Sequence, residues 1–147
     1  WPCHNPGEIR DMALQEEEAR FSGKSIQEKL LVYTAQSVRN FAYRMLICKH
    51  VLDMGYVPLN PFNLWGGHYL YELVDRDVVR NANNNLIRRV DEVWVFWDIS
   101  DGVLPETNLA KESGKPVRYF NIDDLPRSIV GIEEDQVRYE EGVHWQR

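Results

Sequence analysis

Cysteine is scarce in this chain, because its 147 residues include only Cys3 and Cys48. Two cysteines cannot build a disulfide framework, so the sequence is unlike the small secreted scaffolds and we expect a cytoplasmic protein. The first residues lack a basic region followed by an apolar core, so we expect no secretory signal peptide. Long apolar runs are missing as well. None approaches the ~20 residues of a membrane span, so we expect no membrane partner.

Positive charge is also in deficit. Lys and Arg total 17 against 23 Asp and Glu, which gives a net charge of −6. Binding to phosphate backbones needs clustered cations, so this balance argues against a nucleic acid polymer or an anionic membrane as partner. A small phosphorylated ligand is not excluded, because it needs only one or two local cations.

The usual signatures of cofactors and metals are missing too. No Walker loop and no glycine-rich dinucleotide fingerprint follows the first predicted strand. Cys3-His4 and Cys48-Lys49-His50 match no closed zinc pattern, since Cys48 and His50 lie two apart on a predicted helix and point to different faces. We therefore expect no cofactor and no metal.

The chain does contain enough apolar material for one domain with a core. Apolar residues make up 44% of the sequence and include five Trp, which excludes a disordered chain. We predict three segments. Residues 1–29 form an acidic helical extension, residues 30–121 form the domain, and residues 122–147 form a tail that covers a sheet edge or packs on a neighbouring subunit.

Apolar runs alternate with helical periodicity through the central domain. Pro58 suggests that the second predicted strand lies at an edge. The four asparagines within 81–85 favour a break in the second helix, and the segment 60–68 is predicted to be a loop. The alternation predicts an α/β fold: a doubly wound, mainly parallel sheet of four to five strands with helices on both faces, of the Rossmann or flavodoxin-like kind. The predicted strands are 30–35, 56–59, 93–97 and 117–120, and the predicted helices are 38–54, 69–89 and 105–112. The apolar positions at helical spacing in the first helix are Phe41, Met45, Leu46, Val51 and Leu52.

The most informative motif follows the most apolar predicted strand, Val93-Trp94-Val95-Phe96-Trp97. It runs Asp101-Gly102-Val103-Leu104-Pro105-Glu106, with Ala110 four residues later. Glu106 is thereby placed in the first turn of a helix at the carboxyl edge of the sheet, where ligands of open α/β sheets bind. Gly102 would let the backbone approach a ligand closely. A first-turn glutamate is also a common helix-start charge, so the pattern alone leaves a structural role open.

This motif, followed by Gly114-Lys115-Pro116-Val117, resembles the signature of the nucleoside 2-deoxyribosyltransferase superfamily, which includes the 2′-deoxynucleoside 5′-phosphate N-hydrolases. Other pieces resemble that family in the same order along residues 30–121. They are Tyr33-Thr34-Ala35 in the first strand, Tyr56-Val57-Pro58-Leu59-Asn60 at the end of the second, and Asn83 to Asn85 followed by Val90-Asp91-Glu92-Val93 before the third.

The resemblance implies that Glu106 is a nucleophile. It would attack the anomeric carbon of the sugar and displace the base, and water or a second base would resolve the glycosyl-enzyme intermediate. A second acid should protonate the leaving base, and Asp101 and Asp98 are the nearby candidates. Asp91 lies before the strand, at its opposite end, and is expected to be structural. Members of the family are typically oligomers, which implies a homo-oligomer here.

Three departures from the family pattern bear on the activity. Ser100 stands where transferases commonly carry Asp, which is more like the nucleotide hydrolases, whose loop makes room for a 5′-phosphate. Asn108 replaces a usual Gly. Asn83 to Asn85 stand where transferases have a base-side carboxylate, and an amide can bond to a base but cannot supply a proton. Hydrolysis, transfer and a non-catalytic nucleotide-binding or sensor module all stay open.

Two loops complete the predicted site for a small nucleoside or nucleotide. Ser37 and Arg39 follow the first strand, where free N–H groups and a cation suit a 5′-phosphate, although a helix cap with a surface arginine is the alternative. In the loop after the second strand, the rings of Phe62 and Trp65 would stack on a base or plug the core, and Asn60 or Asn63 would read the base edge. His68 is either a proton carrier or a surface residue. The predicted substrate-binding residues are Tyr33, Ser37, Arg39, Asn60, Phe62, Ser100 and Gly102.

Overall fold

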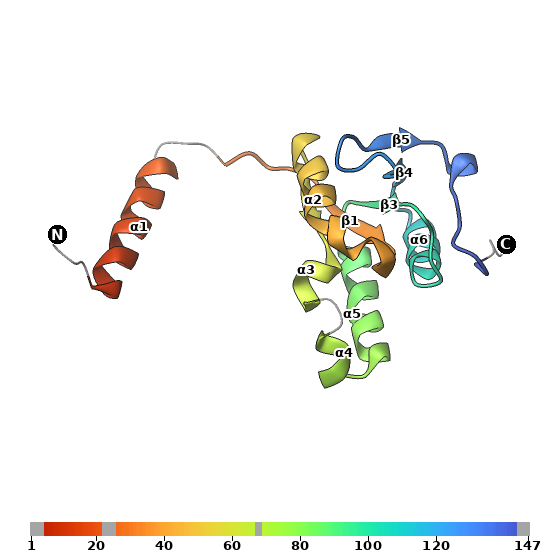
Figure 1. Ribbon diagram of the computed structural model, residues 1–147, viewed down its shortest axis with the longest axis horizontal. Coiled ribbons are helices and arrows are strands. Elements are labelled where there is room, and N and C mark those ends of the chain that lie inside the picture. The colour runs from red at the N-terminus through yellow and green to blue at the C-terminus, as the bar shows by residue number, and fades with distance from the viewer. Residues whose placement is uncertain (1–4, 22–25, 67–68, 144–147) are drawn as a thin grey trace.

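A computed structural model describes residues 5–21, 26–66 and 69–143 of the chain (Figure 1). It is an α/β structure with one five-stranded sheet in the order β2-β1-β3-β4-β5. β1 pairs in parallel with β2 and β3, and β3 pairs in parallel with β4. β5 pairs antiparallel with β4, so the sheet is mixed.

The strands are β1 (Leu31–Gln36), β2 (Val57–Leu59), β3 (Glu92–Phe96), β4 (Val117–Asn121) and β5 (Val130–Ile132). The helices are α1 (Pro6–Phe21), the 3-10 helix η1 (Val38–Tyr43), α2 (Arg44–Asp53), α3 (Pro61–Trp65), α4 (Tyr69–Leu73), α5 (Arg76–Arg89), α6 (Val103–Glu112) and the 3-10 helix η2 (Glu134–Gln136).

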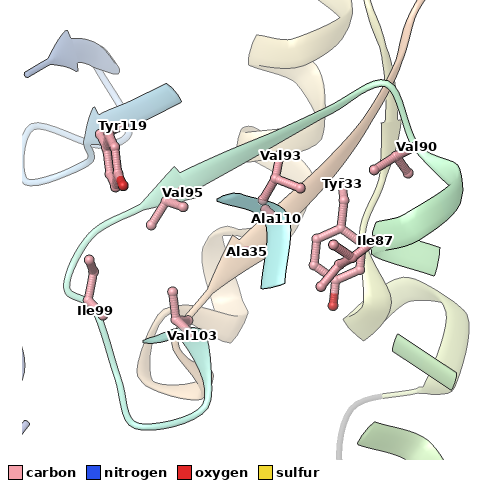
Figure 2. Packing of buried hydrophobic residues seen from close by; sticks show 10 residues of the cluster. All are labelled: Tyr33, Ala35, Ile87, Val90, Val93, Val95, Ile99, Val103, Ala110 and Tyr119. Atoms are coloured by element: carbon pink, nitrogen blue, oxygen red, sulfur yellow. The ribbon is translucent and has the colours of Figure 1, made fainter. Parts of the chain in front are cut away.

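The central strands are covered on both faces, which explains why their sequences are continuously apolar rather than alternating. Successive side chains of a strand point to opposite faces. In β3, Val93 and Val95 pack with residues of α5 and α6, whereas Trp94 and Phe96 pack with Ile47 and other residues on the opposite face. Figure 2 shows the first of these clusters. Its buried members are Tyr33, Ala35, Ile87, Val90, Val93, Val95, Ile99, Val103, Ala110 and Tyr119.

The prediction of a loop over residues 60–68 is wrong, because residues Pro61–Trp65 form α3. The Asn60 side chain accepts a hydrogen bond from the Phe62 N–H at 3.0 Å and caps the helix. Pro61 fits the first helical turn, where no N–H is needed, and Gly66 ends the helix in the left-handed conformation at φ 67°. The residues that suggested a loop are therefore a start signal and a stop signal spaced around one short helix. Gly67 and His68 lie outside the described residues.

The prediction of a helix break around residues 81–85 is also wrong. α5 runs unbroken through the asparagines, and the interruption lies earlier, where Asp75 accepts a hydrogen bond from the Asp77 N–H at 2.8 Å and starts a new helix. The polar side chains find partners that let the helix continue: Asn85 donates to the Asn81 carbonyl at 2.9 Å, and Asn83 is buried. Tertiary contacts override the low helix propensity of asparagine here.

The helix predicted over 38–54 begins as η1 and becomes α-helical only from Arg44. Its buried face is Ile47, Cys48 and Val51, whereas Met45 and Leu52 are exposed. Two of the five expected apolar positions therefore lie on the exposed side of the helix. One expectation about the sheet is confirmed, because β2, which contains Pro58, is an edge strand. Residues of the predicted tail form β5, which pairs with β4.

The N-terminal extension forms α1, which Figure 1 shows lying apart from the sheet. Its apolar side chains Ile9, Met12 and Leu14 are exposed. Among the described residues, no helix combines the length and the apolar character needed to cross a membrane.

Candidate functional site

A cavity of about 420 Å³ lies at the carboxyl ends of β1 and β3. The sheet order changes direction at these strands, because the chain places β2 on one side of β1 and then crosses to place β3 on the other. Ligands of open α/β sheets bind at such a point, and the volume falls within the roughly 300–1,000 Å³ of small-molecule sites. The cavity brings together Ser37, Arg39, Phe62, Ser100, Asp101, Gly102 and Glu106, all of which the sequence had suggested.

Glu106 lines this cavity from the first turn of α6. Ser100 starts the helix, because its buried hydroxyl accepts a hydrogen bond from the Val103 N–H at 3.2 Å. Burial raises the pKa of Glu106 to about 8, and the nearby Tyr33 hydroxyl offsets part of this rise. A carboxyl group with this pKa is mostly protonated at neutral pH in the unliganded protein. Perturbed groups of this kind in a cavity are typical of functional sites.

Tyr33 lies beneath the cavity and does not line it. Its ring packs in the core with Ile87 (Figure 2). Burial, followed by the charge of Glu106, raises the pKa of Tyr33 well above its ordinary value. The two groups are close enough to influence each other, yet the Tyr33 hydroxyl has no hydrogen-bond partner of normal geometry among the described residues. The predicted substrate contact of Tyr33 is therefore replaced in this structure by proximity to Glu106.

The structure places the other carboxylates considered from the sequence in three different surroundings. Asp101 is exposed and lines the cavity, as expected of a partner for Glu106. Asp98 does not line it and instead forms an ion pair with Arg138, which also binds Asp123 at 2.8 Å. Asp91 accepts a hydrogen bond from the Leu31 N–H at 2.7 Å, which agrees with its expected structural role.

Gly102 needs no special backbone conformation. Its φ is −80° and ψ is −35°, in the right-handed region that any residue adopts. A Cβ atom built there would approach only the Ser100 hydroxyl, at 3.8 Å. The expected need for glycine is thus not found in the backbone, although Gly102 does border the cavity.

Ser37 and Arg39 do come together at the cavity, but with a carboxylate between them. The buried Ser37 hydroxyl accepts from the Arg39 N–H at 3.3 Å and donates to the Glu140 carboxylate. The Arg39 Nε lies 3.8 Å from the second oxygen of Glu140. No local pattern marks Glu140, which belongs to the weakly patterned tail and lies about a hundred residues away from its partners along the chain.

Aromatic rings and amides also line the cavity. Phe62 and Trp65 come from α3, Tyr71 from α4 and Asn83 from α5. The Trp65 Nε1–H donates to the Asn83 Oδ1 at 2.7 Å, which fixes the ring and the amide together. Flat aromatic surfaces beside fixed amides suit a planar heterocycle with hydrogen-bonding edges.

Several cavity residues were not anticipated from the sequence. Thr34 has a buried hydroxyl without a partner in the described part of the chain. Arg76 and Arg80 lie one turn apart on α5, and this four-residue spacing is the signal that places both on one helix face. No local signal marks the others. The unanticipated lining residues include Thr34, Gln36, Tyr71, Arg76, Arg80 and Glu140.

Asn60 lies next to the cavity but serves the fold. Its side chain caps α3 and also donates to the buried Gln36 Oε1 at 2.8 Å. We expect Asn60→Ala to lower the free energy of unfolding by about 1–3 kcal/mol, because the change removes a cap and leaves the Gln36 oxygen unpaired. Urea unfolding of the two proteins measures this difference. A change below about 0.5 kcal/mol would show that the cap and the amide bond contribute little.

No cluster of three or more metal-ligating side chains occurs among residues 5–21, 26–66 and 69–143. Cys48 is a free, buried thiol, to which the Asn63 amide donates at 3.5 Å. Cys3 and His4 lie outside the described residues.

These features define an α/β protein with a cavity at the carboxyl edge of its sheet. Residues 32–120, more than half of the chain, match the family described as "Domain of unknown function (DUF7768)". The chain belongs to that family. No curated protein matches the chain.

Proposed function

We propose that this protein cleaves the N-glycosidic bond of a nucleoside or nucleoside 5′-monophosphate, as a hydrolase or a deoxyribosyltransferase. The observation that carries the proposal is the Glu106 carboxyl group lining a cavity that aromatic rings and the fixed amide of Asn83 also line. A carboxylate facing the sugar and a flat pocket for the base are the two parts that such a reaction needs. The resemblance of residues 30–121 to the nucleoside 2-deoxyribosyltransferase superfamily supports the same reaction.

The sheet topology supports the finer fold proposal as well. The order β2-β1-β3-β4-β5 is that of flavodoxin-like proteins, and helices pack on both faces. We therefore propose a doubly wound arrangement, in which β5 is an antiparallel addition at one edge.

In the proposed reaction, the ionised Glu106 attacks the anomeric carbon as the bond to the base breaks. The transition state resembles an oxocarbenium ion, so a carboxylate next to it stabilises the developing positive charge. Asp101, which lines the same cavity, donates a proton to the leaving base. Water, or a second base in a transferase, then attacks the sugar ester and releases Glu106, and the proton from that nucleophile returns to Asp101.

The raised pKa of Glu106 bears directly on this role. Only the ionised form is a nucleophile, and at neutral pH burial keeps most of the carboxyl group protonated. Arg76 and Arg80 line the same cavity, so cationic groups are available to favour ionisation once a ligand excludes water.

A second candidate function is a nucleotide-binding or sensor module that does not turn its ligand over. The protonated state of Glu106 favours it, because a neutral carboxyl group is a hydrogen-bond donor and not a nucleophile. The amides of Asn83 and Asn84 in the cavity favour it too, since they can bind a base but cannot protonate it.

One experiment separates the two candidates. The full chain is incubated with a panel of ribonucleosides, deoxyribonucleosides and their 5′-monophosphates, and free base is measured by chromatography while ligand binding is followed by thermal shift. We expect release of base from at least one compound that also raises the melting temperature. Binding with the compound recovered intact would support the binding module, and neither binding nor release would contradict both candidates.

Three further expectations stay predictions. The proposed ligand is a small molecule and not a nucleic acid polymer, in keeping with the net charge of −6. A homo-oligomer is expected from the family resemblance. A cytoplasmic location rests on the low cysteine content.

A further inference from the structure

Glu140 occupies the corner of the cavity that the sequence had assigned to a phosphate. Its carboxylate accepts a hydrogen bond from the Ser37 hydroxyl and lies 3.8 Å from the Arg39 Nε. The side chain is only 11% exposed, and it lines the cavity together with its two partners. The hydroxyl donor and the cation that would have bound a phosphate are thus engaged by an anion that belongs to the protein.

The backbone around Glu140 holds the carboxylate in this corner. The Glu140 N–H donates to the Ile99 carbonyl at 2.9 Å, and the Ile99 N–H donates to the Arg138 carbonyl at 2.9 Å. The Arg138 side chain is itself bound to Asp98 and Asp123 and lies over the Trp97 ring, 4.7 Å from its centroid. A displacement of Glu140 would therefore disturb residues 138–140, which are bound to residues 97–99 in the loop after β3.

The charge at this corner decides which ligands can enter. A phosphate monoester carries about −1.5 to −2 charges at pH 7, and next to Glu140 it would meet a fixed like charge in a partly buried site. A sugar hydroxyl has the opposite preference, because it can donate a hydrogen bond to the carboxylate. The corner is thus built for a neutral hydroxyl group.

We propose that Glu140 is a specificity-determining residue that makes this cavity select nucleosides with a free hydroxyl in the Ser37 corner and reject their phosphate monoesters. The proposal rests on the proposed function for the identity of the ligand. The rejection of phosphate at this corner rests only on the contacts of Glu140. Of the two substrate classes in the proposed function, this selectivity favours nucleosides over nucleoside 5′-monophosphates.

Substitution of Glu140 by glutamine tests the proposal, because it removes the charge and keeps the shape. Glu141→Gln is the matched control, since Glu141 is the exposed neighbour on the same segment and does not line the cavity. Calorimetry at constant ionic strength measures the affinity of each protein for a nucleoside, for its 5′-monophosphate and for inorganic phosphate. Circular dichroism confirms that each variant is folded.

We expect the wild-type protein and Glu141→Gln to prefer the nucleoside over its monophosphate by about tenfold or more. Glu140→Gln should lose most of this preference and gain affinity for inorganic phosphate. A wild-type preference for the monophosphate would overturn the proposal and point to Arg76 and Arg80 as the anion site. An unchanged preference for the nucleoside in Glu140→Gln would also overturn it, because the rejection of phosphate would then not depend on the Glu140 charge. If no nucleoside binds at all, the proposed function fails, and the inorganic phosphate arm still decides whether Glu140 excludes anions.

Discussion

Replacement of Glu106 by glutamine is expected to reduce the release of free base by about 10³-fold or more. The amide has nearly the same shape as the carboxyl group, but it cannot ionise, attack the anomeric carbon or stabilise the positive charge on the sugar. Binding should be retained, because the walls of the cavity are unchanged. Single-turnover chromatography measures the rate, and thermal shift with the same nucleoside measures binding.

The matched control is Glu112→Gln, which removes an exposed carboxylate from the other end of α6. It should leave the rate unchanged. If Glu106→Gln keeps more than about a tenth of the wild-type rate, Glu106 is not the nucleophile. The pH profile separates two roles for this group: a nucleophile gives a rate that rises with pH up to about 8, whereas an acid gives a rate that falls above it.

The second large effect is a dependence of stability on pH that comes from the same carboxyl group. The pKa of Glu106 is about 8 in the folded protein, and the ordinary value is 4.5. Below pH 4.5 the group is protonated in both states and contributes nothing. Between pH 4.5 and about 8 the unfolded chain loses this proton and the folded protein keeps it, so folding becomes less favourable as pH rises by up to about 1.4 kcal/mol per pH unit. Above about pH 8 the penalty is constant, on the order of a few kcal/mol.

Glu106→Gln removes this penalty, since the amide does not titrate. We expect the variant and the wild-type protein to be about equally stable near pH 4.5, and the variant to be more stable by a few kcal/mol at pH 9. Urea unfolding of both proteins at pH 4.5, 7 and 9 measures the difference. A difference that is the same at all three values would contradict a buried, proton-retaining Glu106. Because it needs no substrate, this measurement is independent of the proposed reaction.

Much of the sheet could be predicted from the sequence because its signals are strong and local. The runs that form β1 and β3 are almost entirely buried, and β4 buries Tyr119 and Phe120. Glu106 could be found because a helix start directly after the most apolar strand has one location in an α/β sheet, namely its carboxyl edge. α3 was missed because Asn60, Pro61 and Gly66 are signals for a turn and for a short capped helix alike.

The asparagines of α5 show a different limit. Local propensity favours a break at 81–85, but the bond from Trp65 to Asn83 comes from a separate helix. The buried face of α2 was misjudged for a similar reason. Met45 and Ile47 are both apolar, and only the packing of the sheet against the helix decides which one is buried.

The sequence by itself determined which segments form the main strands and that Glu106 lies at their carboxyl edge, because these depend on short-range pattern and on the handedness of chain crossovers. Only the tertiary structure decided what surrounds that carboxyl group. Burial beside Tyr33 raises its pKa, and a tail residue, Glu140, occupies the corner beside Ser37 and Arg39. Both effects arise between residues that are far apart along the chain, and contacts of that kind leave no local pattern to read.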